Sequence, residues 1–220
     1  MRKIAYAVSF VSLAIALILS AISAARVDWL VVKTISKPLY TTITDSYGLH
    51  RTCELTITQV PGPGEGDGKI TYRNNECRPF PNKVKDDCDG KNQGFCAVWT
   101  GAAYVDYVSV GFGALALLSI LFGMSTRSRR MRVWRALAGL AMMQTLSQVI
   151  TFAMITDTHR RHRYPGFEHA RPGMGYVLCI LSWVLSFLVT AGVVVTGLAA
   201  DKGHRWAVGN RRYEPIRDYD

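Results

Sequence analysis

Four long runs of apolar residues, separated by charged stretches, dominate this 220-residue chain. Hydrophobic residues make up 49% of the sequence, a fraction that also suits soluble domains, so their grouping matters more than their number. A helix needs about 20 residues to cross the hydrocarbon core of a bilayer. In lipid every backbone amide must be hydrogen-bonded within its own segment, so we expect the runs to be helices. The predicted spans cover residues 4–25, 102–124, 133–155 and 174–200.

The first run also has features of a secretory signal peptide. Arg2 and Lys3 precede it, and small residues such as Ala21, Ser23 and Ala24 stand near its end. The apolar region of a signal peptide usually has about 7–15 residues, and this run is longer. We therefore favour a retained helix over a cleaved leader.

Lysines and arginines beside the spans predict the orientation of the chain. They precede the first span, fill the short connection from Arg127 to Arg132, and recur in the tail 201–220. The positive-inside rule places these three segments, and both termini, in the cytoplasm. The loop 26–99, with ten basic and nine acidic residues, is then outside. The arginines between Arg160 and Arg163 favour the opposite orientation and are outweighed.

Polar side chains within the spans are interpreted first as packing groups. Gln144 and Gln148 share one face of the third span, and buried amides in lipid usually pair with a neighbouring helix. A transport path along these groups is the alternative. Asp106 is an acidic residue near the outer end of the second span. We expect it to be hydrated at the interface, to cap the helix, or to pair with an arginine of a loop.

The outer loop has a pattern of strands and cysteines. Residues 54–60 and 69–73 alternate polar and apolar side chains, and the glycine- and proline-rich residues 61–68 between them favour a turn, which together predict a β-hairpin. Residues 27–35 are a further candidate strand. An isolated hairpin is marginal in water, so a small antiparallel sheet resting on the helices is expected. The fold class predicted is a membrane four-helix bundle with a small extracellular antiparallel sheet.

Four of the five cysteines fall in this loop, at Cys53, Cys77, Cys88 and Cys96. An even number in an oxidising compartment predicts two disulfides, and four cysteines allow three connectivities. No pair has Cys-x-x-Cys spacing, so a zinc ribbon or redox centre is not expected. A bond to Cys96, close to the second span, would tie the loop to the bundle.

A tryptophan shortly after the first span, then Gly-Leu-x-x-x-Cys and a second cysteine in a strand pair, resembles the claudin/PMP22 superfamily. The matching residues here are Trp29, Gly48, Leu49, Cys53 and Cys77. The four spans, long first loop and short basic turn extend the resemblance along nearly the whole chain. The cysteine-containing loop is also similar to fungal Sur7/PalI-like proteins of plasma-membrane domains.

The resemblance implies a claudin-like fold and a disulfide between Cys53 and Cys77, which leaves Cys88 to pair with Cys96. It also implies a plasma-membrane protein that contacts other membrane proteins, in cis or in trans, including copies of itself. His50 stands where the family has a second tryptophan.

Other functional classes find little support in the residues. The formal charge of +10 is concentrated beside the spans, and no nucleic-acid-binding motif is present. No catalytic motif or paired catalytic carboxylates appear, so we expect neither an enzyme nor a cofactor. Metal binding by the histidines of the second outer loop is disfavoured by the arginines around them. In the tail, Tyr213 and Ile216 match a tyrosine-based sorting motif.

The sequence thus predicts an integral membrane protein that acts through its disulfide-bonded outer loop. The leading hypothesis is contact between proteins that organises a membrane domain, a barrier or an adhesion site. An accessory subunit of a channel, receptor or synthase is the first alternative, and a pore or transporter is the second.

Overall fold

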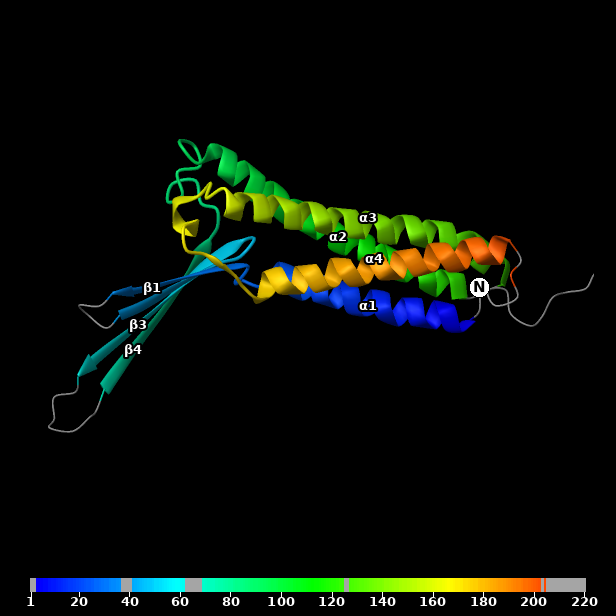
Figure 1. The fold of residues 1–220 in the computed structure, drawn as a ribbon, viewed down its shortest axis with the longest axis horizontal. Helices are drawn as coiled ribbons and strands as arrows, with labels where there is room; N and C mark the ends of the chain where they lie inside the picture. The colour runs from blue at the N-terminus through cyan, green and yellow to red at the C-terminus, as the bar shows by residue number, and fades with distance from the viewer. Residues whose placement is uncertain (1–2, 37–40, 62–68, 125–126, 203, 205–220) are drawn as a thin grey trace, which may run out of the picture.

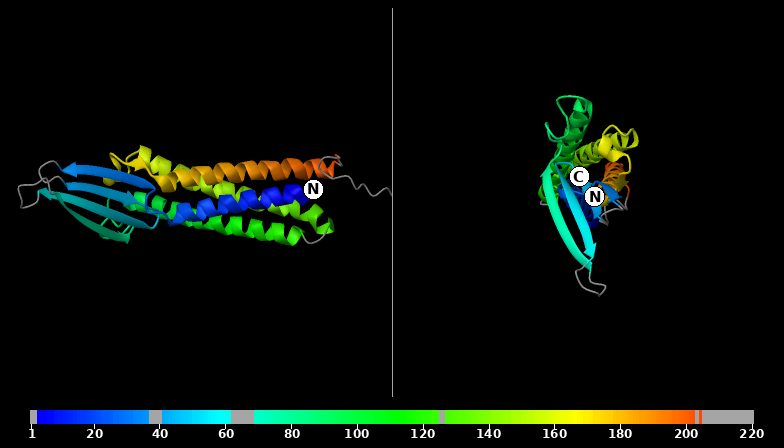
Figure 2. Two further views of the ribbon diagram at one scale, coloured as in Figure 1. Left: turned by 90° about the horizontal axis from the view of Figure 1, so that it is seen from below. Right: turned by 90° about the vertical axis from the view of Figure 1, so that its left-hand side faces the viewer.

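The computed structural model describes residues 3–36, 41–61, 69–124, 127–202 and 204. In this part of the chain, four helices lie side by side and a sheet extends from one end of the bundle (Figure 1). The described strands all lie at this end of the bundle, which we call the sheet end (Figure 2). The helices are α1 (Lys3–Ala25), α2 (Gln93–Met124), α3 (Arg127–Arg160) and α4 (Met174–Asp201).

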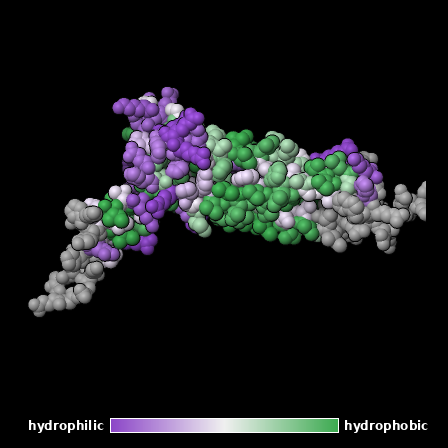
Figure 3. Space-filling model, in the orientation of Figure 1, coloured by the Kyte–Doolittle hydropathy of each residue, from purple (hydrophilic) through white to green (hydrophobic). Residues whose placement is uncertain are grey.

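All four helices are long and apolar enough to cross a membrane. The prediction of four membrane-spanning helices is thus confirmed as far as length and composition go. On the face that Figure 3 shows, apolar side chains form a band across the helices between the hydrophilic sheet end and the opposite end of the bundle. That band has the form expected for a surface in contact with lipid tails. The segments that meet the length and composition of a span are Ala7–Ala25, Gln93–Gly123, Val133–Arg160 and Met174–Asp201.

The helix that contains the predicted second span, residues 102–124, begins earlier than that span. Helix α2 begins at Gln93, inside the predicted outer loop 26–99. Its first turns place Phe95 and Trp99 on one face, four residues apart, where both are buried at the sheet end of the bundle. Helical hydrogen bonds do not require lipid, so a helix can continue beyond the apolar run when its outer turns bury such a face.

The sheet has five antiparallel strands in the order β4-β3-β2-β1-β5. Strands β3 and β4 form the predicted hairpin, whose tip at residues 62–68 lies outside the described residues. Strand β1 agrees with the predicted strand 27–35 except at its start, whereas β2 and β5 were not predicted. The strands are β1 (Leu30–Ser36), β2 (Thr41–Tyr47), β3 (Arg51–Pro61), β4 (Lys69–Pro79) and β5 (Arg171–Pro172).

Two clusters of buried apolar side chains hold these elements together. One lies within the bundle and includes Leu13, Ile120 and Leu137. The other joins the sheet to the helices around Trp29 and Trp99. Its members come from the helix ends and from both loops at that end of the bundle, which we call the outer loops after their predicted side of the membrane. The outer loops therefore share one core with the bundle.

Candidate interaction surface

Two disulfides fix the first outer loop. Cys53 and Cys77 are directly opposite each other on β3 and β4, and they are bonded. Cys88 is bonded to Cys96 in the first turn of α2. This is the pairing that the family resemblance implies, out of the three that four cysteines allow. The first bond sets the register of the hairpin, and the second ties the end of the loop to a helix of the bundle.

The remaining motif residues seat the sheet on the helices. Trp29 is fully buried, and its indole Nε1 donates a 2.8 Å hydrogen bond to the carbonyl of Ser23 at the end of α1. Leu49 is buried in the same core. A Cβ atom at Gly48 would lie 2.7 Å from the Cα of Val27, so only glycine permits this approach of backbone to backbone.

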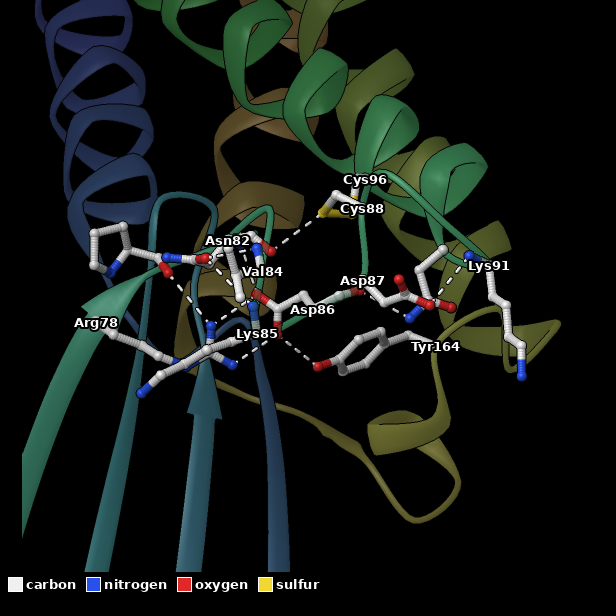
Figure 4. Close-up of a disulfide and its surroundings, with 12 residues drawn as sticks. Arg78, Asn82, Val84, Lys85, Asp86, Asp87, Cys88, Lys91, Cys96 and Tyr164 are labelled. Carbon is white, nitrogen blue, oxygen red and sulfur yellow. Dashed lines mark hydrogen bonds and ion pairs between the residues drawn. A yellow bond between two sulfur atoms is a disulfide. The ribbon is translucent and has the colours of Figure 1, made fainter.

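A buried carboxylate, Asp86, joins the two outer loops (Figure 4). Arg78 donates two hydrogen bonds of 2.7 Å to its two oxygens. The backbone amide of Asn82 donates at 2.6 Å, and the hydroxyl of Tyr164 donates at 2.8 Å from the second outer loop. Burial alone would raise the pKa of Asp86, but these hydrogen bonds lower it. The carboxylate is thus ionised and has partners on both oxygens.

Aromatic rings pack around Tyr164, the partner of this carboxylate from the second outer loop. Tyr164 stacks on Phe95 with ring centroids 4.7 Å apart, and Phe80 and Phe167 complete the cluster. Trp99 donates from its Nε1 to the carbonyl of Gly48 at 3.2 Å. The sheet, the second loop and α2 are therefore held together as a single unit. Sequence reasoning missed Asp86 and Tyr164, because they share no motif.

Three carboxylates form a row across the sheet. Asp45 on β2 is directly opposite Glu54 on β3, which is directly opposite Glu76 on β4. Burial first, and the charge of Glu54 second, raise the pKa of Asp45. Like charges at opposed positions destabilise a sheet by roughly 0.2–1 kcal/mol per pair. The row lines a hollow of about 310 Å³ whose other charged residues are Arg78 and Lys85.

Strand β4 is an edge of the sheet, and no strand pairs with its outer side within the described part of the chain. It has 11 residues, about twice the usual strand length, and its side chains from 71 to 77 are exposed. Such an edge presents unpaired backbone donors and acceptors to another chain. The charges along β4 oppose indiscriminate pairing, as on other natural edge strands.

Within the bundle, the amide of Gln148 pairs across helices as predicted. Its Nε2 donates to the hydroxyl of Ser182 on α4 at 2.9 Å, and that hydroxyl lies 2.8 Å from the carbonyl of Ala16 on α1. Gln144, one turn along α3, is fully buried, and neither end of its amide has a hydrogen-bond partner among the described residues.

The expectation for Asp106 was wrong. Its side chain is 1% exposed, and its Oδ2 has no hydrogen-bond partner in the described structure. Asp106 is 13 residues from the start of α2, beyond the first turn whose backbone amides a cap can reach. Its side chain is enclosed by the protein instead of being hydrated at the surface, and no described arginine pairs with it.

The second outer loop is partly neutralised. Arg161 and Arg163 both contact Asp157, at 2.7 and 2.9 Å, so these two arginines already have an acidic partner within the protein. His159, His162 and His169 form no group with other potential metal ligands among the described residues. The proposed sorting motif at Tyr213 and Ile216 lies outside the described residues.

Comparison with known proteins gives no assignment. No protein-family model matches the chain, and no curated protein matches it in sequence. The functional argument therefore depends on the residues and contacts of this chain itself.

Proposed function

We propose that this protein is a claudin-like membrane protein whose disulfide-bonded outer loop contacts other membrane proteins and so organises a membrane domain, barrier or adhesion site. The row of Asp45, Glu54 and Glu76 carries the proposal. Like charges at directly opposed positions of a sheet carry a cost in stability, yet β2, β3 and β4 hold the row in register beside the hollow. A surface that weakens its own fold is a candidate for binding, because a partner with basic side chains relieves the repulsion.

Two further features support a protein partner. The long edge of β4 offers main-chain hydrogen bonds beside the carboxylates, and a partner strand can add to such an edge. The two disulfides and the Asp86 network hold this surface rigidly on the bundle, which lowers the entropic cost of binding. The proposed partner is another membrane protein or a second copy of this chain, in the plasma membrane, with the sheet outside the cell.

Charge reversal tests this proposal in the full-length protein. We expect the combined change Glu54→Lys and Glu76→Lys to abolish cross-linking to the native partner in intact membranes. The matched control is Glu168→Lys, at an exposed glutamate of the second loop, which should leave cross-linking unchanged. Equal cross-linking by both variants would show that the row is not the contact surface.

Native copurification distinguishes the organising role from that of an accessory subunit. Recovery as homo-oligomers or strands is expected for the organising role. A single larger complex of fixed stoichiometry would instead identify an accessory subunit. The orientation has a separate test, because a thiol reagent applied after reduction should label Cys53 and Cys77 from outside the cell only.

A further inference from the structure

Two hollows lie beside a stacked pair of rings where the sheet meets the bundle. The rings of His50 and Tyr107 are nearly parallel, at 14°, with centroids 4.5 Å apart. Both hollows are lined by these two residues. The first, of about 240 Å³, is otherwise lined by the end of α1 and by Arg26 and Arg51. The second, of about 280 Å³, is also lined by residues within 100–104 in the outer turns of α2 and by Phe80.

The hollows lie at the level where a bilayer's headgroups would meet the protein. The apolar segment of α1 ends at Ala25, which lines the first hollow together with Tyr107. Tyr104 and Tyr107 are 66% and 52% exposed on α2 at the same end of the bundle. Tyrosines in this position are typical of the boundary between lipid tails and water.

The first hollow has the chemistry of a phosphate site. Arg26 is engaged by Asp28 at 2.7 Å, whereas Arg51 is exposed and makes no ion pair within the described part of the chain. The Nε2 atom of His50 is buried without a hydrogen-bond partner among the described residues. Arginine is well suited to phosphate because its planar guanidinium presents several donors at once.

The second hollow has the chemistry of a quaternary ammonium site. Phe80 and Tyr104 line it in addition to His50 and Tyr107, and none of its lining residues is charged at neutral pH. Burial lowers the pKa of His50, so its ring is neutral there and does not repel a cation. Aromatic rings attract such cations through the negative potential above their faces.

We propose that the two hollows bind the zwitterionic headgroup of a phospholipid, with its phosphate beside Arg51 and its quaternary ammonium among Phe80, Tyr104 and Tyr107. The order of the two hollows, counted outward from the apolar band, matches the order of the two charged groups in a headgroup. The phosphate hollow adjoins the end of α1, and the ammonium hollow extends toward Thr100, farther from the apolar band. A phosphocholine headgroup leaves the bilayer in the same order. Bound lipid would fill the junction between the first outer loop and the helices.

The test measures lipids retained by the purified full-length protein in native mass spectrometry. After exchange into equal amounts of phosphatidylcholine and phosphatidylglycerol with the same acyl chains, we expect phosphatidylcholine to be retained preferentially. Arg51→Gln should reduce its retention about ten-fold through loss of a charge-assisted hydrogen bond. Tyr104→Ala should reduce it about five-fold through loss of one ring. Arg73→Gln and Tyr72→Ala, exposed on β4, are matched controls that should retain it fully.

Each contrary result removes a defined part of the proposal. Equal retention of phosphatidylglycerol by the unaltered protein would overturn the ammonium site. Full retention by Arg51→Gln would overturn the phosphate site. Soluble glycerophosphocholine should compete only weakly, and displacement of lipid at equal concentration would show that the ligand is a free solute. An unchanged melting temperature in each variant verifies that the loss of lipid does not come from unfolding.

Discussion

Asp86 and Asp106 are equally buried, at 2% and 1% exposure, yet their surroundings are opposite. Both oxygens of Asp86 accept hydrogen bonds, from an arginine, a backbone amide and a tyrosine. The Oδ2 atom of Asp106 has no partner in the described structure. A buried carboxylate stabilises a fold only when its lost hydration is replaced. The outer loops are thus organised by a satisfied polar group, and the bundle tolerates one that is not.

The largest expected effect is that of Asp86→Ala. The change leaves Arg78 without its counter-charge and removes the acceptor of Tyr164, so the side-chain connection between the two outer loops through Asp86 is lost. We expect the free energy of unfolding to fall by about 4 kcal/mol, in the range for breaking a buried ion pair. Equilibrium unfolding of the purified protein in mixed micelles measures it. Asp89→Ala, at an exposed aspartate of the same loop, is the matched control and should have no effect.

The same measurement on Asp106→Val should give the opposite sign. Valine removes an unsatisfied buried group, so we expect the free energy of unfolding to rise by about 1 kcal/mol. If this variant is destabilised as strongly as Asp86→Ala, Asp106 has a partner in the folded protein and the comparison fails.

The disulfide at Cys88 and Cys96 closes a loop with a sequence separation of 8, and the segment it closes begins two residues after Asp86. Replacing both cysteines by alanine should cost about 2.6 kcal/mol through the entropy of the unfolded chain. Combined with Asp86→Ala, the loss should fall short of the sum by more than about 0.5 kcal/mol, because both act on one unit. Thr151→Val in the bundle is the additive control. If the losses of stability from the cysteine replacements and from Asp86→Ala simply add, the disulfide and the carboxylate act separately.

The sequence predicts the parts of the fold that depend on local pattern. Apolar length predicts the four helices, and alternation predicts the hairpin of β3 and β4. Strand β2, with the sequence Thr-Thr-Ile-Thr-Asp-Ser-Tyr, has Ile43 and Tyr47 as its apolar residues, with polar Asp45 between them on the same face, so no regular alternation reveals it. The outer turns of α2 look like loop because they precede the apolar run. Both elements are stabilised by tertiary contacts that a one-dimensional pattern does not contain.

The residues of the candidate surface also fall into those that the sequence reveals and those that only the fold brings together. The four loop cysteines are evident from the sequence because oxidised cysteines are counted in pairs. Asp86 is not, because its partners Arg78 and Tyr164 lie 8 and 78 residues away along the chain. The carboxylate row is equally hidden, since Asp45, Glu54 and Glu76 become neighbours only through the register of three strands.

The dependence of stability on pH should distinguish the contributions of two carboxylates of the outer loops, Asp86 and Asp45. The pKa of Asp86 is lowered from 3.8, so its stabilisation is present above that value and lost as the pH falls through the lowered pKa. The pKa of Asp45 is raised from 3.8, so its contribution is present below that value and lost as the pH rises through the raised pKa. Melting temperatures at successive pH values should therefore pass through a maximum. In the plot of melting temperature against pH, Asp86→Asn should flatten the side below the maximum, and Asp45→Asn should flatten the side above it. Unchanged sides would contradict the assignment.

Glu54→Gln should have the smallest effect on stability. Glu54 lies between Asp45 and Glu76, so this change relieves both repulsions in the row while preserving shape. We expect the free energy of unfolding to rise by about 0.2–1 kcal/mol, the scale of a cross-strand pair. Glu168→Gln, outside the row, should leave it unchanged. Partner cross-linking should weaken in the first variant only, since the charge that destabilises the sheet is the charge that the partner meets. A loss of stability would show that Arg78 and Lys85, which line the same hollow, already neutralise the row in the free protein.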